Sequence, residues 1–252
     1  ESWWSTVQLD SEWHLFLPWR GLGCWLTTFN PSCQVLKGED ESGIALLAVL
    51  VTRRTWIKGL VPVTQLILHR TGNESEDQIW TEYNGFLHAR RVKDQGVREA
   101  ACFLLESVPG WDELVVGVGI ESELRALQLP MLSRHDAWEA PGYAVDLAKV
   151  RASGGNYLAT LSKNTRYQLG RARKALEQLG QVRFNKAESL EQALHMFRQA
   201  GPLHVRRWGD KGGQSGFTNP LFCQFHENLI CDGFDLGFVE LWEFTVDGNT
   251  IA

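Results

Sequence analysis

Long apolar runs are absent from this sequence. The longest uncharged apolar stretch covers residues 43–51, and nine residues are too few to cross a bilayer. The sequence therefore predicts no transmembrane helix. A strong compositional bias is also absent, since 44% of residues are hydrophobic and 22% are charged, which excludes a fibrous or disordered chain. A length of 252 residues suits one large or two small domains.

Cysteine is scarce. The chain has five cysteines, an odd number, and no C-x-x-C pair. Free thiols in a reducing compartment explain this pattern better than a disulfide framework, so we expect a cytoplasmic protein. Cys223 and His226 would put two possible metal ligands on one helix face, but a structural zinc site needs four. The sequence therefore predicts no metal site.

Charge is divided unevenly along the chain. The net charge is −5, yet residues 149–211 carry 13 basic and 4 acidic side chains, a local charge of +9. Such a block indicates an anionic partner, which would be a phosphate-bearing cofactor, a nucleic acid or an acidic substrate. A solvated helix face explains the same block equally well, so both interpretations stay open here.

Periodicity, caps and turn residues predict a chain of mixed strands and helices. The expected strands cover residues 44–53, 57–68, 78–87, 113–120, 182–184 and 236–246, and residues 54–56 are expected to join the first two as a hairpin. The expected helices cover 93–107, 121–129, part of 158–179, 189–201 and 219–231. The expected N-caps of the last three are Ser162, Ser189 and Asn219. Asp247 and Gly248 are the residues of a tight hairpin turn. The return strand is cut off at Ala252, which we expect to be a truncation.

The helix expected at 158–179 has two faces. An apolar stripe, expected to face the core, consists of Leu169, Ala172, Leu176 and Leu179. Basic side chains cover the opposite face, where the candidate anion-binding residues are Lys163, Arg166, Arg173 and Lys174. Gly170 interrupts this basic face at a cost of about 1 kcal/mol relative to alanine. Close approach of a ligand or backbone would explain that glycine, and so would an incidental glycine on a solvated helix.

Three common motifs of catalytic or nucleotide sites are incomplete or missing. Residues 213–217 resemble G-x-S-x-G, but Phe217 replaces the second glycine. Gly117 and Gly119 begin a G-x-G-x-x-G pattern that fails at Ser122, and no P-loop sequence occurs. The sequence therefore disfavours a serine hydrolase, a Rossmann site and a P-loop nucleotide site.

The second half of the chain carries an ordered set of short motifs. They are L-S-K-x-x-R at 161–166, R-W at 207–208, G-F at 216–217 and D-G-x-x-I-A at 247–252. Their order, from about residue 143 to 252, resembles the GNAT-superfamily proteins known as cellulose-biosynthesis-associated acetyltransferases, which are bacterial. The resemblance implies an α/β (α+β) architecture of tandem GNAT-like folds, each with a mixed central sheet flanked by helices. Residues 1–142 would form a degenerate first domain, and residues 143–252 the incomplete front part of the acetyltransferase domain.

The resemblance also implies an activity. Such enzymes transfer an acyl group from acyl-CoA, typically acetyl-CoA, to an amine, here a small molecule or a saccharide-linked amine. The pyrophosphate of the donor would meet backbone N–H groups at a helix N-terminus, in a [QR]-x-x-G-x-[GA] motif. The nearest segment, residues 206–211, fails because Lys211 replaces the final small residue. We therefore expect the acyl-CoA site beyond residue 252 and this stretch alone to be inactive.

Acyl transfer to an amine needs a base, an oriented acceptor and a stabilised oxyanion. Glu240 and Glu243 are weak candidates for the catalytic base, and their spacing on one strand points them to opposite faces. The resemblance places the acceptor near His204, Arg207 and Trp208. Arg207 could bind a carboxylate or phosphate. Trp208 could form an apolar wall or pack in the core.

Two other functions stay open. Tandem GNAT-like folds also occur in Fem-type aminoacyltransferases, which use aminoacyl-tRNA, and the basic block would then contact RNA phosphates with steep salt dependence. A degenerate, non-catalytic GNAT protein that binds partners in polysaccharide assembly is the third hypothesis.

Overall fold

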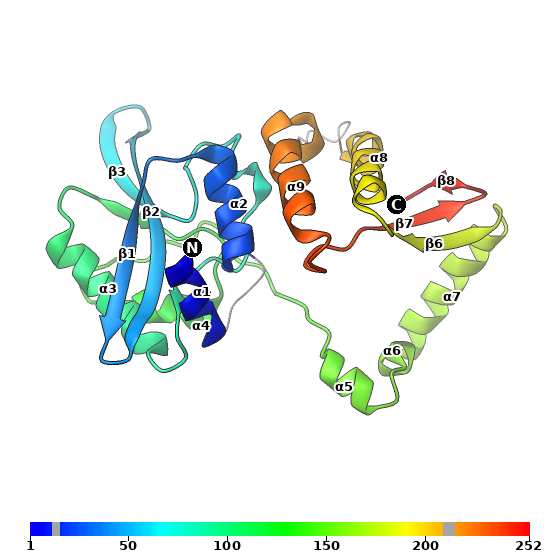
Figure 1. The fold of residues 1–252 in the computed structure, drawn as a ribbon, viewed down its shortest axis with the longest axis horizontal. Helices are drawn as coiled ribbons and strands as arrows, with labels where there is room; N and C mark the ends of the chain where they lie inside the picture. The colour runs from blue at the N-terminus through cyan, green and yellow to red at the C-terminus, as the bar shows by residue number, and fades with distance from the viewer. Residues whose placement is uncertain (12–15, 209–214) are drawn as a thin grey trace. The chain divides into compact units, whose positions relative to one another are not determined.

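The computed structural model describes residues 1–11, 16–208 and 215–252 (Figure 1). Contacts divide the chain into two compact units: unit 1 is Glu1–Arg134 with His204–Val239, and unit 2 is His135–Leu203 with Glu240–Ala252. Each unit has its own β-sheet. The expected division into two GNAT-like halves after residue 142 stays a prediction.

The sheet of unit 1 is mixed, as expected. Its strands are β1 (Cys33–Asp40), β2 (Gly43–Ile57), β3 (Val61–Leu68), β4 (Leu87–His88) and β5 (Glu113–Val115). They follow the order β1-β2-β3-β5, and β4 also pairs with β2. Only the β3–β5 pair is parallel among the described strands. The architecture is therefore a mixed α/β fold consistent with a GNAT-like α+β protein.

Strand β2 contributes side chains to two hydrophobic cores, because successive side chains of a strand point to opposite faces. Leu47, Val49 and Val51 belong to the core that contains residues of α1 (Ser2–Leu9) and α2 (Trp19–Phe29). Leu46, Ala48 and Leu50 belong to a second core with residues of α3 (Lys93–Ser107). Helices on both faces explain why this strand is a continuous apolar run.

Three expected features of this sheet differ from the structure. Residues 54–56, the expected turn, lie inside β2, and the chain turns at Lys58 and Gly59, whose φ angles of 50° and 70° suit a tight hairpin. The strand expected at 78–87 is a short helix η1 (Asp77–Ile79) followed by β4. The strand expected at 113–120 is only β5. Apolar runs alone do not distinguish paired strands from buried loops.

The remaining helices of unit 1 follow their sequence signals closely. Helix α3 has the expected bounds, and α4 (Glu121–Leu124) with η2 (Arg125–Leu127) covers most of 121–129. Helix α9 (Pro220–Gly233) begins after Asn219, whose side chain accepts a hydrogen bond from the Leu221 N–H. A short helix η4 (Gly216–Thr218) precedes it.

Helix α9 packs against α2, although almost 200 residues separate them in the sequence. Phe225 stacks on Phe29 with ring centroids 6.0 Å apart. Asn228 Nδ2 donates to Thr28 Oγ1 at 3.1 Å. The core of the first half is thus completed by a helix from the last third of the chain.

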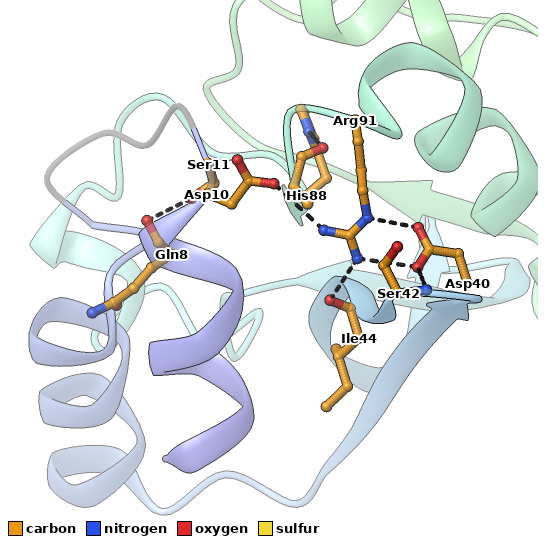
Figure 2. A network of polar contacts seen from close by, with 9 residues as sticks. Gln8, Asp10, Ser11, Asp40, Ser42, Ile44, His88 and Arg91 are labelled. Atoms are coloured by element: carbon orange, nitrogen blue, oxygen red, sulfur yellow. Dashed lines mark hydrogen bonds and ion pairs between the residues drawn. The ribbon is translucent and has the colours of Figure 1, made fainter.

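A polar network on the same unit joins α1, the β1–β2 turn and the end of β4 (Figure 2). Arg91 donates through Nε and Nη2 to the two carboxylate oxygens of Asp40, at 2.7 and 3.1 Å, and through Nη2 to the Ile44 carbonyl. It also contacts the carboxylate of Asp10. The hydrogen bonds from Arg91 lower the pKa of Asp40 below its usual value.

Unit 2 contains short helices and a three-stranded antiparallel sheet. Its elements are α5 (Leu147–Ala152), α6 (Tyr157–Thr160), α7 (Lys163–Glu177), β6 (Val182–Lys186), β7 (Trp242–Val246) and β8 (Asn249–Thr250), in the sheet order β6-β7-β8. Asp247 and Gly248 turn with positive φ angles of 49° and 79°, as the sequence predicts. Ser162 caps α7 as expected, accepting from the Thr165 N–H. The strand expected at 236–246 is shorter, because it begins at Trp242.

Helix α8 (Leu190–Trp208) crosses the boundary between the units. Ser189 Oγ accepts from the Gln192 N–H at its start, in the predicted capping position. The helix continues past Gly201, the expected end, and through Pro202. None of the described helices is long and apolar enough to cross a membrane.

The apolar stripe of α7 is not a core stripe within the described residues. No residue of α7 is buried, and Leu169 is 46% exposed. Leu179, just after the helix, is 72% exposed. Among the described residues, no atom comes within 4 Å of a Cβ built on Gly170, so no described backbone approaches this glycine closely. Amphipathic periodicity indicates which face is apolar but not what covers it.

Gly180 is expected to be intolerant of alanine. Its φ is +152°, and an added Cβ would clash with the carboxylate of Asp247, which accepts a hydrogen bond from the Gln181 N–H at 2.6 Å. Gly180→Ala should destabilise the β6–β7 pairing by about 2 kcal/mol, through backbone strain and loss of that bond. Hydrogen exchange at the β6 and β7 amides measures the loss.

Gly170→Ala is the matched control, since it makes the same change in open space on α7. It should stabilise the helix by up to about 1 kcal/mol. Equal exchange rates at β6 and β7 in Gly180→Ala and the unsubstituted protein would contradict the prediction.

Candidate functional site

The last described turn of α8 brings together the three predicted acceptor-binding residues. His204, Arg207 and Trp208 are spaced i, i+3 and i+4, so they share one helix face. The guanidinium carbon of Arg207 lies 5.4 Å from the centroid of the Trp208 ring, and the His204 and Trp208 rings are 6.2 Å apart. All three side chains are exposed, Trp208 by 44%. This exposure removes the core-packing interpretation of Trp208 for the described chain.

Ser215 is a member of this site that the sequence did not single out. Its Oγ lies 2.8 Å from Nδ1 of His204 and accepts a hydrogen bond from the Phe217 N–H at 3.2 Å. The residue is only 1% exposed. It stood inside the incomplete G-x-S-x-G motif, but nothing local in the sequence pairs it with a histidine eleven positions away.

A series of aromatic rings extends from this pair. The rings of His204 and Phe217 are 5.6 Å apart, those of Phe217 and Phe222 are 5.5 Å apart, and those of Phe222 and His226 are 4.0 Å apart. Nδ1 of His226 donates to the Phe222 carbonyl at 2.8 Å, and burial lowers its pKa. The pair thus stands at the edge of an aromatic cluster on η4 and α9.

Cys223 and His226 share α9, as the sequence suggested for a possible metal pair. The Cys223 thiol lies 3.7 Å from the Phe217 carbonyl, and burial raises its pKa. Across residues 1–11, 16–208 and 215–252, no cluster of three or more potential protein ligands for a metal ion is present.

Glu243 lies in β7, but Glu240 comes before the strand begins, so the expected placement of both carboxylates on one strand is wrong. Glu240 precedes β7, forms an ion pair with Lys186 and accepts a hydrogen bond from Trp242 Nε1 at 3.2 Å. The hydrogen bond from Lys186 lowers the pKa of Glu240, which makes it a weaker base.

Glu243 is in β7 and half-buried. It accepts hydrogen bonds from Asn185 Nδ2 at 3.0 Å and from Thr250 Oγ1 at 3.2 Å. These neutral donors orient the carboxylate without an ion pair from a described cation, so the surroundings of Glu243 suit a base better than those of Glu240.

The predicted anion-binding residues all lie on α7, where each is exposed. Arg173 pairs with Glu177 at 2.7 Å, and Arg166 donates to the Leu161 carbonyl at the helix start. The side chains of Lys163 and Lys174 make no ion pair or hydrogen bond within the described residues. Two of the four cations therefore already have partners.

The segment that came nearest to a pyrophosphate motif falls largely outside the described residues. Gly209 and Lys211 are among positions 209–214, so its geometry is not described.

Residues 163–252 match the family model of the Acetyltransferase (GNAT) domain. The match covers just over a third of the chain and includes every predicted site residue. It supports the GNAT superfamily, and acyl transfer in general, for this part of the sequence. No curated protein and no solved structure matches the chain.

Proposed function

We propose that this protein is a GNAT-type N-acyltransferase that moves an acyl group from acyl-CoA, in the simplest case acetyl-CoA, to an amine. The match of residues 163–252 to the GNAT acetyltransferase domain carries this proposal. The grouping of His204, Arg207 and Trp208 on one helix face supports an acceptor site inside the matched region. GNAT domains use acyl-CoA as co-substrate, and the proposed chemistry requires no metal.

The proposed reaction joins the acceptor nitrogen to the acyl carbon and breaks the thioester C–S bond. The ammonium must first lose a proton, and the CoA sulfur leaves as a thiolate that takes up a proton. A carboxylate is a suitable base for the first step. We assign this role to Glu243 rather than Glu240, because Lys186 lowers the basicity of Glu240.

The finer parts of the proposal come from the sequence resemblance. We propose a bacterial, cytoplasmic member of the cellulose-biosynthesis-associated group, with a tandem arrangement of GNAT-like folds and a small-molecule or saccharide-linked amine as acceptor. The scattered, odd number of cysteines supports a reducing compartment.

The full-length natural protein is expected to release CoA thiol from acetyl-CoA only when an amine acceptor is present. Thiol release measured against a panel of amines, including amino sugars, tests this. Glu243→Gln should lower kcat by about 100-fold or more, the usual contribution of a general base. Glu240→Gln is the matched control and should keep kcat within about threefold, because its carboxylate already serves the ion pair with Lys186.

Two results would redirect the assignment. Binding of aminoacyl-tRNA that weakens steeply with salt, without acetyl-CoA turnover, would favour the Fem-type alternative, for which the exposed basic side chains of α7 are the supporting observation. The absence of turnover with every donor, together with saturable partner binding, would favour the non-catalytic alternative.

A further inference from the structure

We propose that Ser215 is a positioning residue that fixes His204 as a hydrogen-bond donor, and that His204 and Arg207 together bind an oxyanion group of the acceptor. The oxyanion is a carboxylate or a phosphate. This inference rests on the proposed acyl transfer for its biological meaning, but the hydrogen-bond pattern that carries it is independent of that reaction.

The donor role of His204 follows from counting hydrogen bonds at Ser215. Its Oγ accepts the Phe217 N–H with one of its two lone pairs, and the hydroxyl also has one hydrogen to donate. Within the described part of the chain, the acceptor in reach of this 1% exposed hydroxyl is Nδ1 of His204, 2.8 Å away. If Nδ1 of His204 instead donated to Oγ, the buried Ser215 hydroxyl would have no described acceptor for its own hydrogen, which is unfavourable.

A neutral imidazole whose Nδ1 accepts a hydrogen bond carries its proton on Nε2. The one basic lone pair of the neutral His204 ring, on Nδ1, is then engaged by the Ser215 hydroxyl and does not face an amine. The ring presents an N–H from an exposed position instead. His204 is for this reason a binding group and not the catalytic base.

The charge at the end of α8 indicates which kind of ligand group the His204 Nε2–H would bind. A helix C-terminus carries about half a negative charge, which alone would repel an anion. Arg206 and Arg207 in the last described turn supply two positive charges and more than offset it. The exposed guanidinium of Arg207 lies over the Trp208 ring, and arginine binds carboxylates and phosphates through paired N–H groups. An oxyanion between Arg207 and His204 Nε2 satisfies both donors.

His226 provides an internal reference for the tautomer. Its Nδ1 faces a backbone carbonyl, which only accepts, so Nδ1 must carry the proton. Long-range ¹H–¹⁵N NMR spectra of the labelled 252-residue protein should show protonated Nε2 for His204 and protonated Nδ1 for His226. Ser215→Ala should abolish the preference of His204 for the tautomer protonated on Nε2, and it should leave the tautomer of His226 unchanged. Protonated Nδ1 at neutral His204 would overturn the proposal.

Binding is tested on the same protein with inorganic phosphate and with acetate as probes. Saturable shifts at His204 Nε2 and Arg207 Nε that vanish in Arg207→Ala are expected. A response to phosphate alone identifies a phosphate group, and a response to acetate identifies a carboxylate. No saturable shift with either probe would overturn the oxyanion assignment.

If Ser215→Ala does not fold, three substitutions of His204 distinguish a hydrogen-bond donor from a catalytic base. Glutamine places an N–H near Nε2 of the histidine it replaces, whereas asparagine and alanine do not. In the full-length natural protein, His204→Gln should keep the KM for the acceptor within about threefold, and His204→Ala and His204→Asn should raise it by roughly 10- to 100-fold, the value of one charge-assisted hydrogen bond. Equal loss of kcat in all three variants would indicate a base and contradict the proposal. If no acyl transfer is found, the proposed function fails, while the NMR results still decide the tautomer and the anion site.

Discussion

Replacing Phe225 with alanine is expected to lower the free energy of unfolding of unit 1 by about 3–5 kcal/mol, the usual loss for a buried phenylalanine. The Phe225 side chain is fully buried and stacks on Phe29 of α2. The backbone carbonyl of Phe225 lies 3.7 Å from Sγ of Cys24, which is also in α2. Because this ring joins α9 to the core of the first half, its removal leaves a cavity between two helices. Urea titration with hydrogen exchange at the α2 and α9 amides measures the effect.

Phe103→Ala is the matched control. Phe103 lies on α3 of the same unit but is 50% exposed, so the same change should cost about 1 kcal/mol or less. Similar losses in the two variants would show that α9 does not contribute to the core of unit 1 in solution. Reading local exchange alongside global unfolding is necessary because a protein with two units need not unfold in one step.

Acidification is expected to destabilise unit 1 through His69. Burial lowers the pKa of this histidine from 6.5 to about 4. Asn84 donates both amide hydrogens to the Leu68 and Val116 carbonyls, so its Oδ1 accepts from Nδ1 of His69. Nε2 of His69 is buried and has no hydrogen-bond partner among the described residues. The folded state thus holds a neutral ring.

The sign of the effect follows from proton binding. Below pH 6.5 His69 binds a proton in the unfolded state, but in the folded state it binds one only near pH 4. The free energy of unfolding therefore falls as the pH falls from 6.5 to about 4. The difference of about 2.5 pKa units, at 1.36 kcal/mol each, amounts to about 3 kcal/mol at or below pH 4, of which about 2 kcal/mol is lost by pH 5. Urea unfolding between pH 7 and pH 4 measures it.

His69→Asn isolates this contribution. Asparagine keeps a donor for Asn84 and tolerates the φ of +51° at this position, but it does not titrate. Burial also lowers the pKa of His226, and that contribution remains in both proteins, so the difference between them reports His69 alone. An identical pH dependence of stability in His69→Asn and the unsubstituted protein would contradict the prediction.

Local signals in the sequence predicted many of the helices and one turn. Ser162, Ser189 and Asn219 cap helices where expected, and Asp247 with Gly248 turns as expected. These signals work because a cap or a tight turn involves side chains and backbone groups only a few residues apart. The helix at 93–107 was predicted to the residue.

The candidate site was only partly accessible to such reasoning. His204, Arg207 and Trp208 could be grouped from the sequence because they are neighbours on one helix, and their role in acceptor binding stays a prediction. Ser215 was not paired with His204, because the contact joins residues eleven positions apart that lie on different elements. The difference between Glu240 and Glu243 as bases was also hidden, since it arises from Lys186 and Asn185 on the neighbouring strand.

Caps, turns, amphipathic faces and the motif order that resembles GNAT proteins are thus properties of the amino-acid sequence alone. The tertiary fold determined three further features: the packing of α9 against α2, the exposure of the apolar stripe on α7, and the neutral state of His69. Each depends on whether residues far away in the chain remove a side chain from water, and this is a property of the assembled core that no local pattern contains.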